Sequence, residues 1–132
     1  MNKNVAKVNR TRASMLSGTE AEMLACKYLQ KKGLKLLERN FATRRREIDL
    51  VMQDRSCLVF VEVRFRQSTN YGSAEESISQ RKCQRLQAAA LAYLQQRGQS
   101  ITIEARFDAV AISPDHAPRG NFAINWVQNI LI

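Results

Sequence analysis

Residues 46–66 read R-E-I-D-L-V-M-Q-D-R-S-C-L-V-F-V-E-V-R-F-R, and the rest of the chain is best interpreted against this stretch. Two segments, Glu47–Gln53 and Cys57–Phe65, are rich in β-branched and aromatic residues, which favour strands. The polar residues between them are typical of a tight turn. The sequence therefore predicts a β-hairpin.

The turn determines which residues face each other across this hairpin. Centred on its turn, the hairpin places Asp49 opposite Glu62 and Glu47 opposite Arg64, all on one face. Facing Cβ atoms lie roughly 4.5–5.5 Å apart, and like charges so placed are destabilising. A divalent cation between Asp49 and Glu62 would explain that pair. Alternatively, Glu62 is half solvated near the strand end and Glu47 forms an ion pair with Arg64; spacing alone favours neither reading.

The second strand of the hairpin is apolar on both faces before Glu62 interrupts it. One face carries Val59, Val61, Val63 and Phe65, and the other begins with Leu58 and Phe60. A strand of this kind lies in the middle of a sheet that is covered by helices. A carboxylate buried there is costly unless it is paired or holds a metal ion.

The composition bounds the class of protein. A chain of 132 residues is long enough for one domain with a buried core. Its 21 Lys and Arg against 12 Asp and Glu give a net charge of +9, which favours a polyanionic partner, most often nucleic acid. No apolar run reaches membrane-spanning length and the N-terminus lacks a signal-peptide core, so no membrane partner is expected. Three scattered cysteines predict reduced thiols in a cytoplasmic protein.

The domain boundary is predicted between a basic arm and a folded unit. Residues 1–17 contain four basic side chains and no acid, and they are expected to be disordered. Their role is either contact with phosphates or only solubility. Residues 18–132 are expected to form the α/β domain.

A helix is predicted to follow the arm. Thr19 as N-cap with Glu22 three residues later fits a capping box, and Gly33 is a good stop. Apolar residues recur at helical spacing from Ala21 to Leu29. Glu22 lies at the border of that apolar face, so it either completes the cap or delivers a third carboxylate from a helix packed over the hairpin.

Two basic clusters flank the hairpin. Arg44, Arg45 and Arg46 precede it, and Arg66 directly follows its second strand. A second helix, opening at Ser73 or Ser79 and ending near Arg97, carries basic side chains off its buried face: Arg81, Lys82 and Arg85. These residues are either solvated charges or the binding surface for a nucleic-acid backbone.

The remaining segments complete an α/β pattern. Leu34–Phe41 is predicted as a short first strand, and two strands, Ile101–Ile103 and Arg106–Ser113, follow the second helix. Phe122–Val127 is predicted as a last strand at a sheet edge, with Trp126 in the core. This order of elements predicts a mixed sheet with helices packed against it.

Several motifs, in this order, resemble the YraN-like family of small bacterial proteins. They are G-T-E-A-E-M-L-A-x-x-Y-L-x-x-x-G, E-R-N-F, E-I-D-L, V-F-V-E-V-R, Y-G-S-A-E-E-S-I, A-A-x-A-Y-L and R-F-D-A-V-A-I. The resemblance extends from about Gly18 to Trp126. It implies a restriction-endonuclease-like single domain, similar to archaeal Holliday-junction resolvases.

The resemblance also implies a set of site residues. Nucleases of this kind share a helix glutamate, a strand aspartate and an E-x-K on the next strand, and these positions fall on Glu22, Asp49, Glu62 and Arg64. Three residues depart from the family pattern: Ala21 and Arg46 replace glycines, and Arg64 replaces lysine. The last departure matters most, because arginine effectively cannot lose its proton and serve as a base.

The function expected from these residues is hydrolysis of a nucleic-acid phosphodiester, DNA more than RNA, in branched or single-stranded substrates. Asp49, Glu62 and the carbonyl of Val63 would bind Mg²⁺ or Mn²⁺, and Glu22 would hold a second metal ion or its water. Arg64 would offset phosphate charge. The alternatives are a nucleic-acid-binding module that does not cut, and an interaction subunit on the same fold. The resemblance makes a homodimer plausible.

Overall fold

The computed structural model describes residues 5–7 as backbone, and residues 16–44, 47–66, 80–99, 103–114 and 121–130. Its elements, in chain order, are β1 (Val5–Lys7), α1 (Gly18–Lys31), β2 (Lys35–Ala42), β3 (Glu47–Asp54), β4 (Cys57–Phe65), α2 (Gln80–Gln96), β5 (Ala105–Pro114) and β6 (Asn121–Val127).

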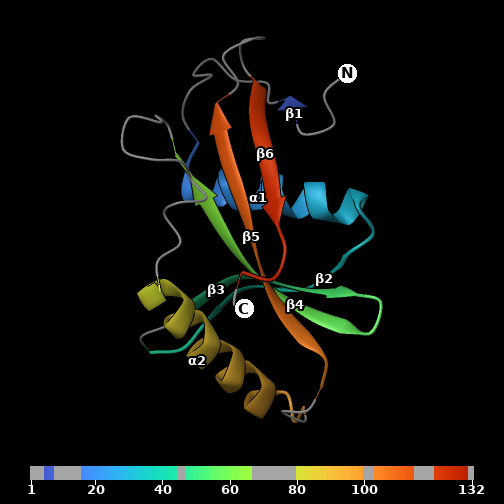
Figure 1. Ribbon diagram of the computed structural model, residues 1–132, viewed down its shortest axis with the longest axis vertical. Coiled ribbons are helices and arrows are strands. Elements are labelled where there is room, and N and C mark those ends of the chain that lie inside the picture. Colours follow the sequence, from blue (N-terminus) through green and yellow to red (C-terminus); the bar gives the residue numbers. More distant parts are fainter. Residues whose placement is uncertain are drawn as a thin grey trace.

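The described strands form one six-stranded sheet in the order β1-β6-β5-β4-β3-β2 (Figure 1). The pair β4–β5 is parallel, and the other four pairs are antiparallel. Parallel neighbours require a long crossover, and α2 lies in the segment that connects β4 to β5. The predicted α/β class, a mixed sheet flanked by helices, is confirmed.

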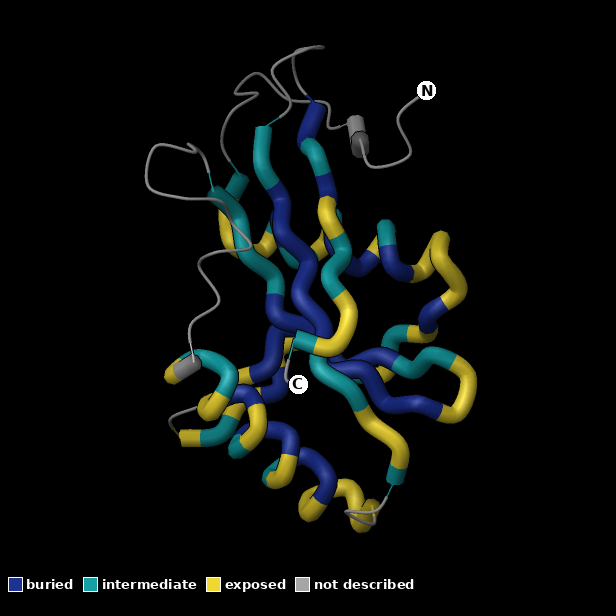
Figure 2. The backbone as a smooth tube through the Cα atoms, viewed as in Figure 1, coloured by how far each residue is buried: buried dark blue, intermediate teal, exposed yellow. Residues whose placement is uncertain are grey.

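Each helix covers its own side of the sheet. Buried side chains of α1, among them Leu29, pack in one cluster with Leu50 and Val61. Buried side chains of α2 pack in a second cluster, where Tyr93 meets Phe60 edge-on at 5.8 Å between ring centroids. The expectation that β4 is buried on both faces is therefore correct, and the central strands are the buried part of the chain (Figure 2).

The β3–β4 hairpin has the predicted register over most of its length. Paired residues run from Asp54 with Cys57, beside the turn, to Leu50 with Val61. The turn uses a positive φ of 58° at Arg55. The ladder ends at Leu50, so the expected cross-strand pairs of Asp49 with Glu62 and of Glu47 with Arg64 do not form. On the other edge of β3, Glu47 pairs with Ala42 of β2.

The cap of α1 differs from the prediction. Ser17 is the N-cap: its Oγ accepts from Glu20 N at 3.1 Å, and its own N–H donates to Glu20 Oε1 at 2.9 Å. The predicted cap, Thr19 with Glu22, is wrong because S-x-x-E begins two residues earlier. Glu22 is thereby released from any capping role. The predicted stop at Gly33 is confirmed, with a φ of 103°.

Four other expectations are corrected. Val5–Lys7 pairs with β6, so part of the predicted disordered arm belongs to the sheet, and β6 is an interior strand. Ile103 lies in a bend outside any strand. Trp126 is only partly buried where it packs against the core, and its ring nitrogen donates to Asp108. The capping pattern at Ser73 lies outside the described residues, as do both residues before Ile103.

Neither helix, within the described part of the chain, combines the length and the apolar content needed to cross a membrane.

The corrected cap gives a direct test. Ser17→Ala should lower the free energy of unfolding by about 1 kcal/mol, because the Glu20 N–H loses its side-chain acceptor. Thr19→Ala, exposed in the first turn, is the matched control and should change it by less than about 0.5 kcal/mol. Urea denaturation measures both. Equal losses would contradict the observed cap.

Candidate active site

The site begins where β3 and β4 separate. Ile48 and Leu50 would share a face of a regular strand, yet Ile48 packs in the cluster with α2 and Leu50 in the cluster with α1. The reversal falls on Asp49, whose Oδ2 accepts the N–H of Val63 at 2.8 Å. A side chain thus replaces the main-chain acceptor that a continuing ladder would supply, and it holds the Asp49 carboxylate in the gap.

Glu62 enters the same gap from β4. Its carboxylate is buried, and the residue is only 5% exposed. Its Oε2 lies 3.1 Å from Lys82 Nζ of α2 and 3.5 Å from Arg64 Nη1. The expected ion partner of Arg64 was Glu47; the partner seen here is Glu62, two residues away on the same strand.

Glu22 approaches from the opposite side, on α1. Burial raises its pKa, and the negative charge of Asp49 raises it further, while a hydrogen bond with Asn40 acts in the other direction. Asn40 has a φ of 51°, an uncommon conformation for a residue inside a strand. The helix carboxylate therefore lies within electrostatic reach of Asp49, as the sequence suggested.

These groups line one cleft of about 660 Å³. Its walls come from the start of α1, the β2–β3 connection, the end of β4 and the start of α2. Its charged lining residues are Glu22, Arg44, Glu47, Asp49, Glu62, Arg64, Lys82 and Arg85. Acidic groups and basic groups thus share one concave surface, which is a common arrangement in sites that bind a cation together with a phosphate.

Asp49 is the most perturbed acid in this cleft. Burial raises its pKa to about 7, helped by the negative charge of Glu62 and, less strongly, of Glu47. The Val63 N–H and the Lys82 ammonium act in the other direction. The Val63 N–H needs an acceptor but not a charged one, so a buried acid with acidic neighbours at this position is a candidate functional group.

The donor set suits a hard cation that takes oxygen ligands. Among the described residues, no three side chains of His, Cys, Asp or Glu form a cluster that could hold a metal ion. The predicted set needs two carboxylates, Asp49 and Glu62, with the Val63 carbonyl, and the cleft lining contains all three residues. The burial of Asp49 is only partly compensated by the Val63 N–H and Lys82, which fits a cation in the gap.

The predicted nucleic-acid contacts divide into three groups. Arg44, Lys82 and Arg85 line the cleft. Arg66 and Arg81 are not part of its lining; the N–H of Arg66 donates to the Ile112 carbonyl at 3.0 Å. Arg45 and Arg46 lie outside the described residues.

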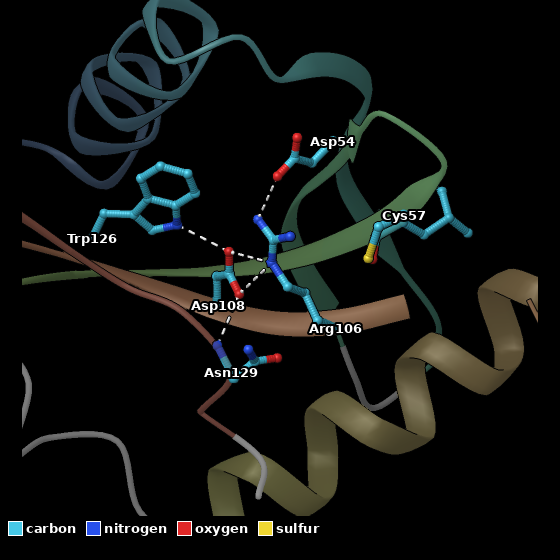
Figure 3. Close-up of polar contacts among 7 residues, drawn as sticks. Asp54, Cys57, Arg106, Asp108, Trp126 and Asn129 are labelled. Carbon is cyan, nitrogen blue, oxygen red and sulfur yellow. Dashed lines mark hydrogen bonds and ion pairs between the residues drawn. The ribbon is translucent and has the colours of Figure 1, made fainter. Parts of the chain in front are cut away.

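A third buried carboxylate, Asp108 on β5, was not singled out from the sequence. It is 0% exposed and accepts from Arg106 Nε at 3.1 Å, Trp126 Nε1 at 2.9 Å and Asn129 N at 3.1 Å (Figure 3). Arg106 also reaches Asp54 at 3.0 Å. The network ties β5, β6 and the β3–β4 turn together. The signal was an acid inside the apolar run R-F-D-A-V-A-I.

Fold and cleft together define a class: a small α/β domain whose mixed sheet opens between two strands onto buried carboxylates. The family follows from sequence, because the model of "Uncharacterised protein family UPF0102" matches residues 21–112. The chain belongs to this family, which confirms the YraN-like resemblance.

Relatives match along most of their length. A UPF0102 protein of Nitrosococcus oceani is 46% identical over 112 residues, 85% of this chain and 88% of its own. One of Stutzerimonas stutzeri is 47% identical over 116 residues, 88% of this chain and 94% of its own. A third, from Photobacterium profundum, is 46% identical over 117 residues, 87% and 89% of the two chains.

The raised pKa of Asp49 predicts a pH-dependent cost to stability. From about pH 4 to about pH 7 the unfolded chain releases this proton while the folded chain keeps it, so stability falls as pH rises. Asp49→Asn should therefore match the wild type at pH 4 and exceed it at pH 8 by about 2–4 kcal/mol in metal-free buffer. Denaturation at both pH values measures this.

The control for that experiment is Glu104→Gln, which removes an exposed acid outside the cleft lining. It should show no such pH-dependent gain. If wild type and Asp49→Asn lose stability in parallel between pH 4 and pH 8, the pKa of Asp49 is not raised in the folded chain.

Proposed function

We propose that this protein is a metal-dependent nuclease that hydrolyses DNA phosphodiesters in the cleft between α1 and α2. The observation that carries the proposal is the position of Asp49, buried in the gap between β3 and β4 beside Glu62, in a cleft that Glu22 also lines. A neutral side chain could accept the Val63 N–H equally well, so the hydrogen bond does not by itself explain an acid there. Basic residues on the same surface suit a phosphate backbone.

Asp49, Glu62 and the carbonyl of Val63 would hold Mg²⁺ or Mn²⁺. Such an ion would polarise a phosphoryl oxygen of the DNA and activate a water molecule. The Val63 N–H donates to one oxygen of Asp49 and holds that carboxylate in the gap. Glu22, with its raised pKa, would orient the attacking water through a hydrogen bond from the α1 side.

Arg64 takes the position of the motif lysine, and its role follows from its chemistry. Arginine does not serve as a base in proteins, so Arg64 would supply positive charge to the phosphate. Arg44 and Arg85, at the rim of the cleft, would bind the phosphates on either side of the scissile bond.

A second function, DNA binding without cleavage, is favoured by one observation. Arg64 stands where related nucleases carry a lysine, and its guanidinium is engaged with Glu62. The same cleft would then hold a branched or single-stranded DNA segment. Cleavage assays distinguish the two functions.

Cleavage should require Asp49 and tolerate a lysine at position 64. With Mn²⁺ and junction, flap or single-stranded DNA, Asp49→Asn should abolish activity. Arg64→Ala should reduce the rate about 100-fold, the cost of losing one charge-stabilising donor. Arg64→Lys keeps the charge and should keep or raise the rate. If neither wild type nor Arg64→Lys cuts, while Asp49→Asn binds DNA like wild type, the binding module replaces the nuclease.

DNA affinity should fall steeply with salt. Each phosphate contact contributes roughly 0.7–0.9 to the slope of log affinity against log salt, so Arg44→Ala and Arg85→Ala should each reduce it by about that amount. Lys27→Ala removes an exposed charge outside the cleft lining and should leave the slope nearly unchanged. Fluorescence anisotropy at several salt concentrations measures the slopes. Identical slopes for all variants would place the DNA elsewhere.

A further inference from the structure

Two cations share one oxygen of Glu62. Lys82 Nζ lies 3.1 Å from Oε2 and Arg64 Nη1 lies 3.5 Å from the same atom. The Glu62 side chain is 6% exposed and that of Lys82 is 34% exposed, so the carboxylate is fixed in the cleft while the lysine reaches it from the rim. Lys82 comes from α2, whereas Glu62 and Arg64 come from β4.

The charges at the start of α2 are unusual for a helix. Its first turn contains no acid, and Arg81 and Lys82 lie there. Cations are disfavoured at a helix N-terminus because that end carries the positive pole of the helix dipole. By contrast, α1 follows the usual preference, with Glu20 in its first turn and Lys31 in its last. A helix whose first turn goes against this charge preference often belongs to a functional site.

A divalent cation held by Asp49 and Glu62 would bind the same carboxylate that Lys82 contacts. A divalent ion carries twice the charge of the Arg64 guanidinium, so it would repel the Lys82 ammonium more strongly than Arg64 does. Lys82 has a flexible four-carbon stem and a compact charge, so it can move away at low cost. Arg64 stands two residues from Glu62 on the same strand, which leaves it less room to withdraw.

Building on the nuclease function above, we propose that Lys82 is the resting counter-ion of Glu62 and a switch between metal and DNA. When a divalent cation binds, Lys82 leaves Glu62 and its ammonium pairs with a phosphate of the DNA strand. Metal and DNA then bind cooperatively, because the ion releases a cation that DNA uses. By linkage, DNA must strengthen metal binding by the same factor.

The first experiment measures Mn²⁺ affinity of the full chain without DNA, by isothermal titration calorimetry. Lys82→Gln should bind Mn²⁺ about tenfold more tightly than wild type, because a competing charge near the ion is gone. Lys82→Arg keeps the charge and should stay close to wild type. The matched control is Arg81→Gln, which removes the same charge from the exposed neighbour outside the cleft lining and should change affinity less than about twofold.

The second experiment measures binding of a phosphorothioate single-stranded oligonucleotide with and without Mn²⁺. Mn²⁺ should strengthen binding by wild type and by Arg81→Gln. For Lys82→Gln that strengthening should be about tenfold smaller, although the variant holds the metal more tightly. Tighter metal binding with weaker coupling is a combination that a purely structural role of Lys82 does not produce.

Two outcomes overturn the inference, and they differ. If wild type binds Mn²⁺ and Lys82→Gln binds it equally or more weakly, Lys82 only positions Glu62, and the proposed nuclease stands. If wild type binds no Mn²⁺, and Asp49→Asn behaves identically, the metal site and the nuclease fail together with the switch.

Discussion

The hydrogen bond from Val63 N–H to Asp49 Oδ2, 2.8 Å long, is the interaction on which the cleft depends. A main-chain donor at the end of a ladder must find an acceptor when it is buried. Here a side chain provides one, so β3 and β4 can separate beyond the pair Leu50–Val61 without an unpaired N–H at Val63. Because α1 and α2 cover opposite sides of the sheet, both helices reach the gap, one with Glu22 and the other with Lys82.

The two buried aspartates in this sheet differ in their hydrogen-bond partners and in the charges of their neighbours. Asp108 accepts hydrogen bonds from Arg106, Trp126 and the main chain of Asn129, so its burial is compensated and it connects distant elements. Asp49 has the Val63 N–H as a donor, while its carboxylate neighbours oppose its charge. The first arrangement stabilises a fold. The second lowers stability at neutral pH, which fits a group kept for binding a cation.

The basic residues around the cleft also divide by geometry. Arg64 belongs to the same strand as Glu62 and stays beside it, whereas Lys82 arrives from a helix in the β4–β5 crossover. An ammonium delivered by a separate element can be moved without disturbing the sheet. Although Arg64 stands where the family pattern has lysine, the site still contains a lysine. Lys82 contacts the same oxygen of Glu62 that Arg64 contacts.

The sequence by itself determined the hairpin and its register near the turn, the glycine stop of α1 at Gly33, the burial of β4 on both faces and the α/β class. These features follow from local periodicity and turn chemistry, which neighbouring residues carry. Only the tertiary structure decided that the β3–β4 ladder ends at Leu50, that β6 is interior because β1 pairs with it, and that Asp108 gathers partners from β6 and the residues after it. Each of these depends on groups that packing brings together from distant parts of the chain, and such contacts leave no mark in the spacing of nearby residues.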